Sequence, residues 1–343
     1  MTKNPDRMRA VEAQAFSLDA LKITQRSVPT PGPGEILVKV AAASLNYRDL
    51  AVLSGTYLPD LPLPYVPVSD AAGTVAELGG RVDRFKVGDR VIPCYIQGWR
   101  DGDLTFEQRT TQTLGAPLDG VLQDFIVVPA EDAVHTPDQL SDAEAATLPI
   151  AALTAWHCLR SGGVAAGKSV LVQGSGGVAL FALQFSKALG ATVIALTSSE
   201  EKRALLNEMG AETIIDYKKT PQWADAVRVA TGGKGVDIVV ETTGTSLPQS
   251  LAACAFGGFI GVIGFVGGYE TTLNIRQLIG PKIRMEGIVV GSRAMMNEML
   301  QVMDAHAIRP VIADSFTLDT VVDAFAALKR GAKPGKIVVL VSE

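Results

Sequence analysis

The sequence predicts an α/β protein in which a doubly wound parallel sheet is joined to a β-rich, barrel-like domain. From residue 169 onward, short apolar runs alternate with helical patterns, as strands and helices do in a doubly wound sheet. Before that point, many short strand patterns are separated by glycine and proline turns, which is typical of a barrel or sandwich-like barrel. A length of 343 residues suits two domains.

The first third contains strand patterns at residues 8–16, 35–44, 72–79, 88–93 and 120–128. A helical turn is expected after Asn46 and ends near Gly55. Residues 99–117 are polar and long for a connection, which is typical of a functional or mobile loop. Ser141 and Glu144 form a capping box that predicts a helix start, and a second helix follows at residues 151–160.

The second half contains strand patterns at residues 169–173, 192–196, 212–217, 236–241, 258–264 and 284–290. Helices are predicted at residues 181–189, 223–230, 247–255 and 295–305. The helix at 320–329 and the strand at 336–341 do not extend this alternation, so they are candidates for a return to the first domain. The apolar run from Phe259 to Gly264 either pairs with a second copy in a homodimer or lies inside the sheet.

A glycine-rich turn follows the strand at residues 169–173, and a helical pattern follows the turn. Gly174, Gly176 and Ala179 take the three small-residue positions of a dinucleotide fingerprint. The first position allows a tight turn, the second lets the backbone approach a pyrophosphate, and the third lets the helix pack close to the strand. Gly177 and Val178 are also expected to face the pyrophosphate, and the N–H groups at the start of the helix that follows would face the phosphates. A glycine turn that binds nothing is the alternative.

The next strand ends without the acidic residue that would bind both ribose hydroxyls. Thr197 and Ser198 stand there instead, followed by the cations Lys202 and Arg203. Hydroxyl and cationic donors suit a 2′-phosphate, so we expect NADPH rather than NADH. The alternative is structural, because Ser198 and Glu201 also have the spacing of a capping box.

Composition excludes several classes of function. The net charge is −5 without a dense basic run, so nucleic acid is an unexpected partner. No stretch of about 20 apolar, charge-free residues predicts a membrane span, and no signal-peptide pattern opens the chain. The three cysteines lie far apart, which fits a reducing cytoplasm. The three histidines are equally scattered, and we interpret His157 as a packed side chain.

Several motifs together resemble the medium-chain dehydrogenase/reductase family over nearly the whole chain. They are Pro-Gly-Pro-Gly-Glu35-Ile-Leu-Val-Lys-Val, Asn46-x-x-Asp49, Phe85-Lys-Val-Gly-Asp89-Arg-Val, Leu153-Thr-Ala-Trp156, the fingerprint, Ala188-Leu-Gly-Ala191 and Gly291-Ser-Arg293. The resemblance implies a GroES-like β-barrel catalytic domain at residues 1–145 and 293–343. It also implies a Rossmann NADP-binding domain at residues 146–292.

The resemblance also implies the residues that bind the cofactor. With the fingerprint, the expected set is Thr154, Gly174, Gly176, Gly177, Val178, Thr197, Ser198, Lys202, Tyr217, Thr243, Ile263, Phe265, Gly291, Ser292, Arg293 and Lys336.

The zinc ligands of the family's alcohol dehydrogenases are missing from this chain. Asn46 stands where the first cysteine ligand would be, Ser69-Asp70 replaces the His-Glu pair, and the later ligand position falls near Ile150. Residues 99–117 also lack the four cysteines of the structural zinc lobe. Since zinc prefers nitrogen and sulfur ligands, we expect a metal-free enzyme that resembles the quinone oxidoreductase branch.

Without a metal, hydride addition to a simple carbonyl lacks its main electrostatic aid. A quinone or an α,β-unsaturated carbonyl is less demanding, because the charge spreads over a phenolate or an enolate. The candidate catalytic residues are Asn46 and Tyr57 as hydrogen-bond donors, with Tyr47 and Arg48 as further candidates. Arg48 and Asp49 form an expected structural pair, and no proton donor stands out, so solvent is the expected proton source.

Two other functions stay open. One is an alcohol dehydrogenase that acts on alcohols and aldehydes. The other is a cofactor-binding redox sensor with little turnover, which fold alone does not exclude.

Overall fold

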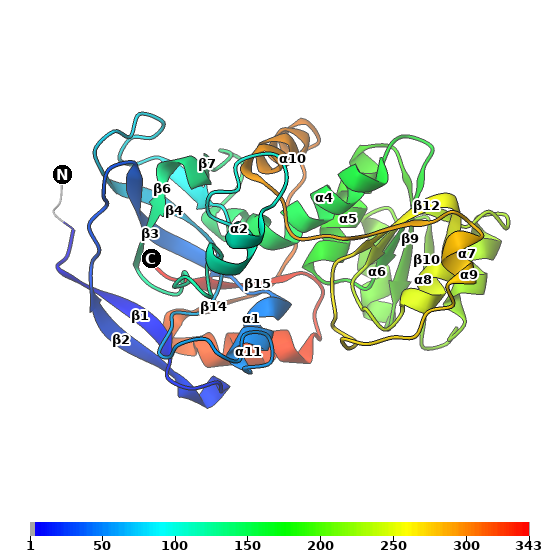
Figure 1. Ribbon diagram of the computed structural model, residues 1–343, viewed down its shortest axis with the longest axis horizontal. Coiled ribbons are helices and arrows are strands. Elements are labelled where there is room, and N and C mark those ends of the chain that lie inside the picture. Colours follow the sequence, from blue (N-terminus) through cyan, green and yellow to red (C-terminus); the bar gives the residue numbers. More distant parts are fainter. Residues whose placement is uncertain (1–3, 343) are drawn as a thin grey trace. The chain divides into compact units, whose positions relative to one another are not determined.

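The computed structural model describes residues 4–342 and divides into two compact units (Figure 1). The first unit comprises residues up to 150, 292–304 and 309 onward, and the second comprises residues 151–291 and 305–308. The β-rich unit and the doubly wound parallel sheet expected from the sequence are both present.

A seven-stranded sheet forms the core of the first unit. Its order is β14 (Ile312–Thr317), β15 (Lys336–Leu340), β3 (Glu35–Ser44), β4 (Asp70–Leu78), β5 (Arg90–Pro93) and β7 (Ala133–His135), and β6 (Phe125–Pro129) also pairs with β3. The C-terminal strand β15 therefore lies beside β3, which comes from the first fifty residues (Figure 1). Alternating apolar residues such as Ile36, Val38 and Val40 point into one buried cluster, as a half-buried strand requires.

The remaining elements of the first unit surround this sheet. A hairpin is made by β1 (Arg7–Ala13) and β2 (Leu21–Ser27), and the second of these strands was missed by the sequence analysis. The helices are α1 (Tyr47–Leu53), α2 (Phe106–Thr111), α3 (Asp142–Ala145), α10 (Arg293–Ala305) and α11 (Val321–Arg330). Helix α2 lies within residues 99–117, which were expected to be irregular.

The second unit contains a six-stranded parallel sheet. Its order is β10 (Thr213–Asp216), β9 (Thr192–Thr197), β8 (Ser169–Gln173), β11 (Val236–Glu241), β12 (Cys254–Val262) and β13 (Arg284–Gly287). Its helices are α4 (Leu153–Gly162), α5 (Gly177–Ala188), α6 (Glu200–Glu208), α7 (Trp223–Ala230), α8 (Leu247–Ala253) and α9 (Arg276–Ile279). Strand β12, which contains Phe259, lies between β11 and β13, so the suggestion that it pairs with a second copy is wrong. The edge strands of this sheet are β10 and β13.

Two helix starts differ from the sequence analysis. Helix α5 begins at Gly177 rather than at residue 181, immediately after the glycine turn. Helix α6 is capped by Ser199, whose hydroxyl accepts from the Lys202 backbone N–H, and not by Ser198. Within the part of the chain that the structure describes, no helix has the length and apolar character needed to cross a bilayer.

Candidate active site

Helix α1 and strand β4 bring together the positions that the sequence analysis compared with zinc ligands. Asp49, in the first turn of α1, accepts a hydrogen bond from the backbone of Asn46 over 2.7 Å. The Asn46 side-chain nitrogen donates to Asp70 Oδ2 over 2.8 Å, and the backbone N–H of Ile150 donates to the same oxygen over 3.1 Å. Positions 46, 70 and 150 therefore converge.

Lys336, at the start of β15, completes this buried polar cluster. Its ammonium donates to the Leu45 carbonyl over 2.5 Å and to Asn46 Oδ1 over 2.6 Å. The side chains of Asp49, Asp70 and Lys336 are all buried. Asn46 thus links a cation and an anion through its two amide ends, and Asp70 Oδ1 is buried without a hydrogen-bond partner among the described residues.

Burial dominates the protonation of this cluster. It raises the pKa of Asp70 to about 7, although Lys336 and the Asn46 hydrogen bond act in the opposite direction. Burial likewise raises the pKa of Asp49 against the influence of Arg48, and it lowers the pKa of Lys336 against the influence of Asp70.

A second group of side chains continues from this cluster through Arg48. The Arg48 guanidinium donates to Ser69 Oγ over 2.8 Å and to the Ala116 carbonyl over 2.5 Å, and Ser69 donates to Asp49 over 3.2 Å. The expected Arg48–Asp49 pair is present only at 3.9 Å. Arg48 therefore serves mainly to fix residues 114–116 against α1.

Tyrosines flank Arg48. Its guanidinium carbon lies 5.7 Å from the ring centroid of Tyr57 and 5.1 Å from that of Tyr95, within cation–π range. Arg109, from α2, donates to the Tyr57 hydroxyl. Arg48 and Tyr57 were predicted from the sequence, whereas Tyr95 and Arg109 were not, because their contacts depend on the path of residues 95–117. Tyr47 is exposed on the first turn of α1.

The residues of the cluster do not fit a zinc ion. Zinc in proteins takes mainly thiolate, imidazole and carboxylate ligands. Here the converging groups are an amide, a hydroxyl already bonded to Asp49, and the carboxylate of Asp70. The Lys336 ammonium already occupies the position beside Asn46 Oδ1. No group of three or more His, Cys, Asp or Glu side chains gathers as a metal site within residues 4–342.

In the second unit, the candidate cofactor residues lie at the carboxyl ends of the parallel strands. The glycine turn follows β8, Thr197 ends β9 and Ser198 follows it. Tyr217 follows β10, Thr243 follows β11, and Ile263 and Phe265 follow β12. Ligands bind at this edge in open parallel sheets. Thr154 lies in α4 and is buried.

The glycine turn fits a pyrophosphate. Gly174 has φ +82°, a conformation that other residues adopt at a cost. A side-chain carbon added at Gly174 or Gly176 would meet no protein atom within 4 Å, so the space beside this backbone is open. Gly176 caps α5 without any side-chain hydrogen bond, which leaves the first N–H groups of the helix available to an anion.

A buried carboxylate, not noticed in the sequence, ties two of these strand ends together. Glu241, the last residue of β11, accepts from the backbone N–H groups of Thr243 over 2.9 Å and Gly244 over 3.0 Å. It also accepts from the Gln173 side chain of β8 over 2.7 Å. Gln173 in turn accepts from Thr242 N and Thr243 Oγ1, each over 3.1 Å. This network fixes Thr243 relative to the glycine turn.

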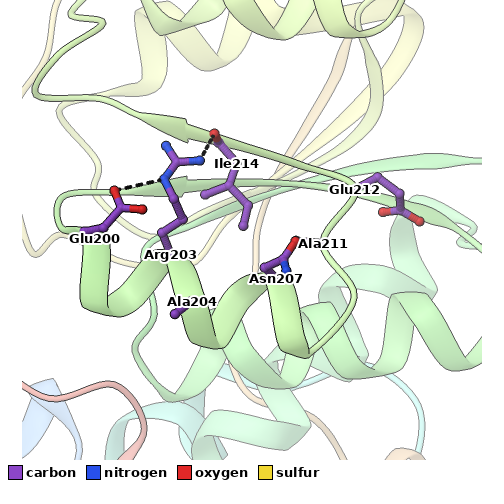
Figure 2. Close-up of a pocket in the computed structure, with 7 residues that line it drawn as sticks. All are labelled: Glu200, Arg203, Ala204, Asn207, Ala211, Glu212 and Ile214. Atoms are coloured by element: carbon purple, nitrogen blue, oxygen red, sulfur yellow. Dashed lines mark hydrogen bonds and ion pairs between the residues drawn. The ribbon is translucent and has the colours of Figure 1, made fainter.

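Arg203 does not join the expected phosphate-binding group. Figure 2 shows its guanidinium paired with Glu200 and with the Ile214 carbonyl, at distances of 3.5 Å and 2.9 Å. It lines a surface pocket with Asn207 and Glu212. Arg203 is therefore a structural cation, whereas the role of Lys202 stays a prediction.

Three expected cofactor residues belong to the first unit. Lys336 lies in the cluster with Asn46 and Asp70, and Ser292 is buried at the start of α10. Arg293 donates to the carbonyl and the carboxylate of Glu131, over 2.6 Å and 2.5 Å. Gly291 is the last residue of the second unit before this change of unit.

Family models match both units. Residues 32–138 match the alcohol dehydrogenase GroES-like domain, and residues 177–305 match the zinc-binding dehydrogenase family.

Curated relatives match nearly the full chain. A zinc-type alcohol dehydrogenase-like protein of Schizosaccharomyces pombe is 41% identical, over 96% of this chain and 97% of its own. An acryloyl-coenzyme A reductase of Sulfurisphaera tokodaii is 30% identical, over 93% and 96%. A quinone oxidoreductase of Pongo abelii is 29% identical, over 97% and 98%.

Solved structures agree with the fold. An alcohol dehydrogenase-type protein of Sinorhizobium meliloti superimposes with a TM-score of 0.93 at 38% identity, over 99% of this chain and 100% of its own. An NAD-dependent alcohol dehydrogenase gives 0.90 at 32% identity, over 97% and 100%. A mycobacterial protein in complex with NADPH gives 0.81 at 26% identity, over 97% and 100%. With its two matched domains and its full-length relatives, the chain belongs to the medium-chain dehydrogenase/reductase family of oxidoreductases.

Proposed function

We propose that the protein is an NADPH-dependent, zinc-independent oxidoreductase that delivers hydride to quinones or α,β-unsaturated carbonyl compounds. The proposal rests on the side chains at positions 46, 69 and 70, which are not a set of zinc ligands. The ammonium of Lys336 supplies the buried positive charge at this place. Relatives named quinone oxidoreductase and acryloyl-coenzyme A reductase support this substrate class.

The cofactor proposal rests on the second unit. The open glycine turn and the N-terminus of α5 suit a pyrophosphate, and Ser198 and Lys202 follow β9 where a 2′-phosphate would lie. The nicotinamide, when bound, supplies the hydride. The similar mycobacterial structure that contains NADPH supports NADP over NAD, whereas the NAD-dependent neighbour supports the reverse.

The reaction places few demands on the protein. Hydride adds to the β-carbon of the conjugated acceptor, the electrons of its double bond move to the carbonyl oxygen, and a proton from solvent completes the saturated product. The side chains then have to orient the acceptor and stabilise the enolate or phenolate oxygen. Tyr57, with its hydroxyl held by Arg109, is the group proposed for that contact. Asn46 directs its amide at Asp70 and Lys336, so its proposed role is to position α1 and this cluster.

A zinc-dependent alcohol dehydrogenase is the second candidate, because the Schizosaccharomyces pombe relative carries a zinc-type name. The two functions are separated by following nicotinamide absorbance with a benzoquinone, an enone and a simple aldehyde. NADPH and NADH are compared, each with and without chelator, and bound zinc is measured by mass spectrometry. Oxidation of NADPH in the presence of quinone or enone, at a rate that chelator does not change, supports the proposal. Turnover of aldehyde alone, lost on chelation with stoichiometric zinc, refutes it.

We also propose a homodimer formed through the second unit. Strand β13 is the edge of its sheet, and Met285 on this strand is exposed. An unpaired strand edge is a template for strand pairing with another copy. Light scattering that gives a monomer mass at micromolar concentration contradicts this proposal.

A further inference from the structure

Arg109 is held in place by an ordered segment rather than by a mobile loop. Helix α2 begins with a capping box between Thr105 and Gln108. The Gln108 side chain also donates to the Gly98 carbonyl over 2.9 Å, and the backbone of Gln97 donates to Gln112 over 2.8 Å. These hydrogen bonds hold the two ends of the loop at residues 97–112 together, and they thereby fix the position of Arg109 in this loop.

The Arg109 guanidinium is half-buried but has few protein acceptors. A guanidinium carries five N–H donors. Its side-chain acceptor among residues 4–342 is the Tyr57 hydroxyl, and no carboxylate of these residues forms an ion pair with it. Two other arginines of the same unit differ, because Arg100 pairs with Asp132 and Arg90 pairs with Asp142. Partial burial of a cation without an anionic partner costs free energy, and a ligand that supplies the anion offsets that cost.

The surroundings of Arg109 reinforce the positive charge. The guanidinium carbon of Arg48 lies 5.7 Å from the ring centroid of Tyr57, and that of Arg109 lies 6.0 Å from the same centroid. The terminal nitrogens of Arg48 donate to Ser69, Leu114 and Ala116, and its Nε is buried without a hydrogen-bond partner among the described residues. Arg109 donates to the Tyr57 hydroxyl alone among the side chains of residues 4–342, so most of its donors are left for a ligand.

We propose that Arg109 and Tyr57 form an anion-binding subsite, and that the acceptor reduced by this protein carries a carboxylate bound there. The inference rests on the proposed function and narrows its substrate class to acidic conjugated carbonyls. The planar guanidinium can donate two parallel hydrogen bonds to a carboxylate, and the ring of Tyr57 provides an apolar surface beside it. The carboxylate is unchanged in the reaction, since hydride and proton add only across the carbon–carbon double bond.

Binding is tested separately from turnover. Levulinate and its methyl ester are used as unreactive probes, and β-acetylacrylate and its methyl ester as substrates, with the cofactor-loaded protein. Wild type should bind levulinate at least about tenfold more tightly than the ester, as expected for a charge-assisted hydrogen bond. It should show the same preference in kcat/KM for β-acetylacrylate. In Arg109→Met the acid-to-ester ratio should fall to near one for both pairs, and Arg109→Lys should keep part of it.

Arg330→Met is the matched control, because Arg330 is an exposed arginine at the end of α11, and it should retain the wild-type ratio. Equal binding of levulinate and its ester by wild type overturns the inference, and so does a ratio that survives in Arg109→Met. If the acid preference in binding depends on Arg109 while no enone or quinone is reduced, the subsite stands and the proposed function fails.

Discussion

The ammonium of Lys336 donates to the side-chain carbonyl of Asn46 over 2.6 Å, and the amide nitrogen of the same asparagine donates to Asp70 over 2.8 Å. Replacing Lys336 with Met leaves the two buried carboxylates, Asp49 and Asp70, without this cation. We expect a loss of about 3–5 kcal/mol in the free energy of unfolding, measured with denaturant, because an uncompensated buried charge is costly.

The double variant Asp70→Asn with Lys336→Met is the control for this prediction. It removes both charges at once, so it should be more stable than Lys336→Met alone. If the two losses simply add, Lys336 and Asp70 are not coupled and the explanation is wrong.

Asp70 should make stability depend on pH in a defined window. Burial raises its pKa to about 7 in the folded protein, whereas an aspartate in the unfolded chain titrates near about 4. Between these values the folded state holds a proton that the unfolded chain has released. The contribution of Asp70 is therefore fully present below about pH 4 and is lost as pH rises to about 7, by at most about 1.4 kcal/mol per pH unit. The stability difference between wild type and Asp70→Asn should change across this window, and a constant difference contradicts the assignment.

Gly176→Ala should separate cofactor binding from folding. The added methyl group meets no protein atom within 4 Å, and Gly176 has φ −74°, so the cofactor-free protein should keep its melting temperature. The same methyl group enters the space expected for the pyrophosphate, and the dissociation constant for NADPH should rise by about tenfold or more. Gly80→Ala, which also meets no protein atom, is the control and should leave both quantities unchanged. Unaltered NADPH affinity in Gly176→Ala argues against the predicted site.

Lys202 and Arg203 should differ in their effect on cofactor choice. Lys202→Met is expected to lower the ratio of NADPH to NADH affinity by about tenfold, because it removes a charged donor from the expected 2′-phosphate site. Arg203→Met should leave that ratio unchanged, since its guanidinium is bonded to Ile214 and Glu200. Titrations of each variant with both dinucleotides measure the affinity ratio. A larger drop in Arg203→Met than in Lys202→Met contradicts the structural role of Arg203.

Glu241→Gln should weaken cofactor binding and stability together. The amide puts donors against the Gln173 side chain and the backbone N–H groups that the carboxylate now accepts from. We expect a loss of about 1–3 kcal/mol in unfolding free energy and a higher dissociation constant for NADPH. Asp237→Asn, at the other end of β11, removes a carboxylate bonded to Lys168 and Ser169. It should lower stability without changing cofactor affinity, and equal effects of the two variants on affinity exclude a positioning role for Glu241.

Elements with a strong local pattern were predictable, and those defined by tertiary contacts were not. The strand at residues 169–173 is β8 as expected, because an uninterrupted apolar run ends at a glycine turn. Helix α2 was missed because six residues give no measurable period, although Thr105 and Gln108 have capping-box spacing. The start of α5 was placed too late, since glycine at a helix start has the same pattern as a turn.

The site residues also divide into those with a local sequence motif and those that are brought together only by tertiary contacts. Asn46, Arg48 and Tyr57 were selected by motif, and the structure places them in one connected group with Lys336. The partnership of Arg109 with Tyr57 spans more than fifty positions, and that of Gln173 with Glu241 spans more than sixty. Neither has a local signal, because the partners meet only when separate chain segments fold together.

The position of β15 sets an order of events during synthesis. The six-stranded sheet comes from one continuous stretch and is complete once β13 has left the ribosome. The seven-stranded sheet is completed later, since β3 gains its neighbour β15 only when residues 336–340 emerge. A nascent chain stalled before Ile312 therefore contains the complete six-stranded sheet and an incomplete first unit that still lacks Lys336. Loss of the segment at residues 336–340 would consequently affect the Asn46 cluster, nearly three hundred residues earlier in the chain, before it affected the glycine turn.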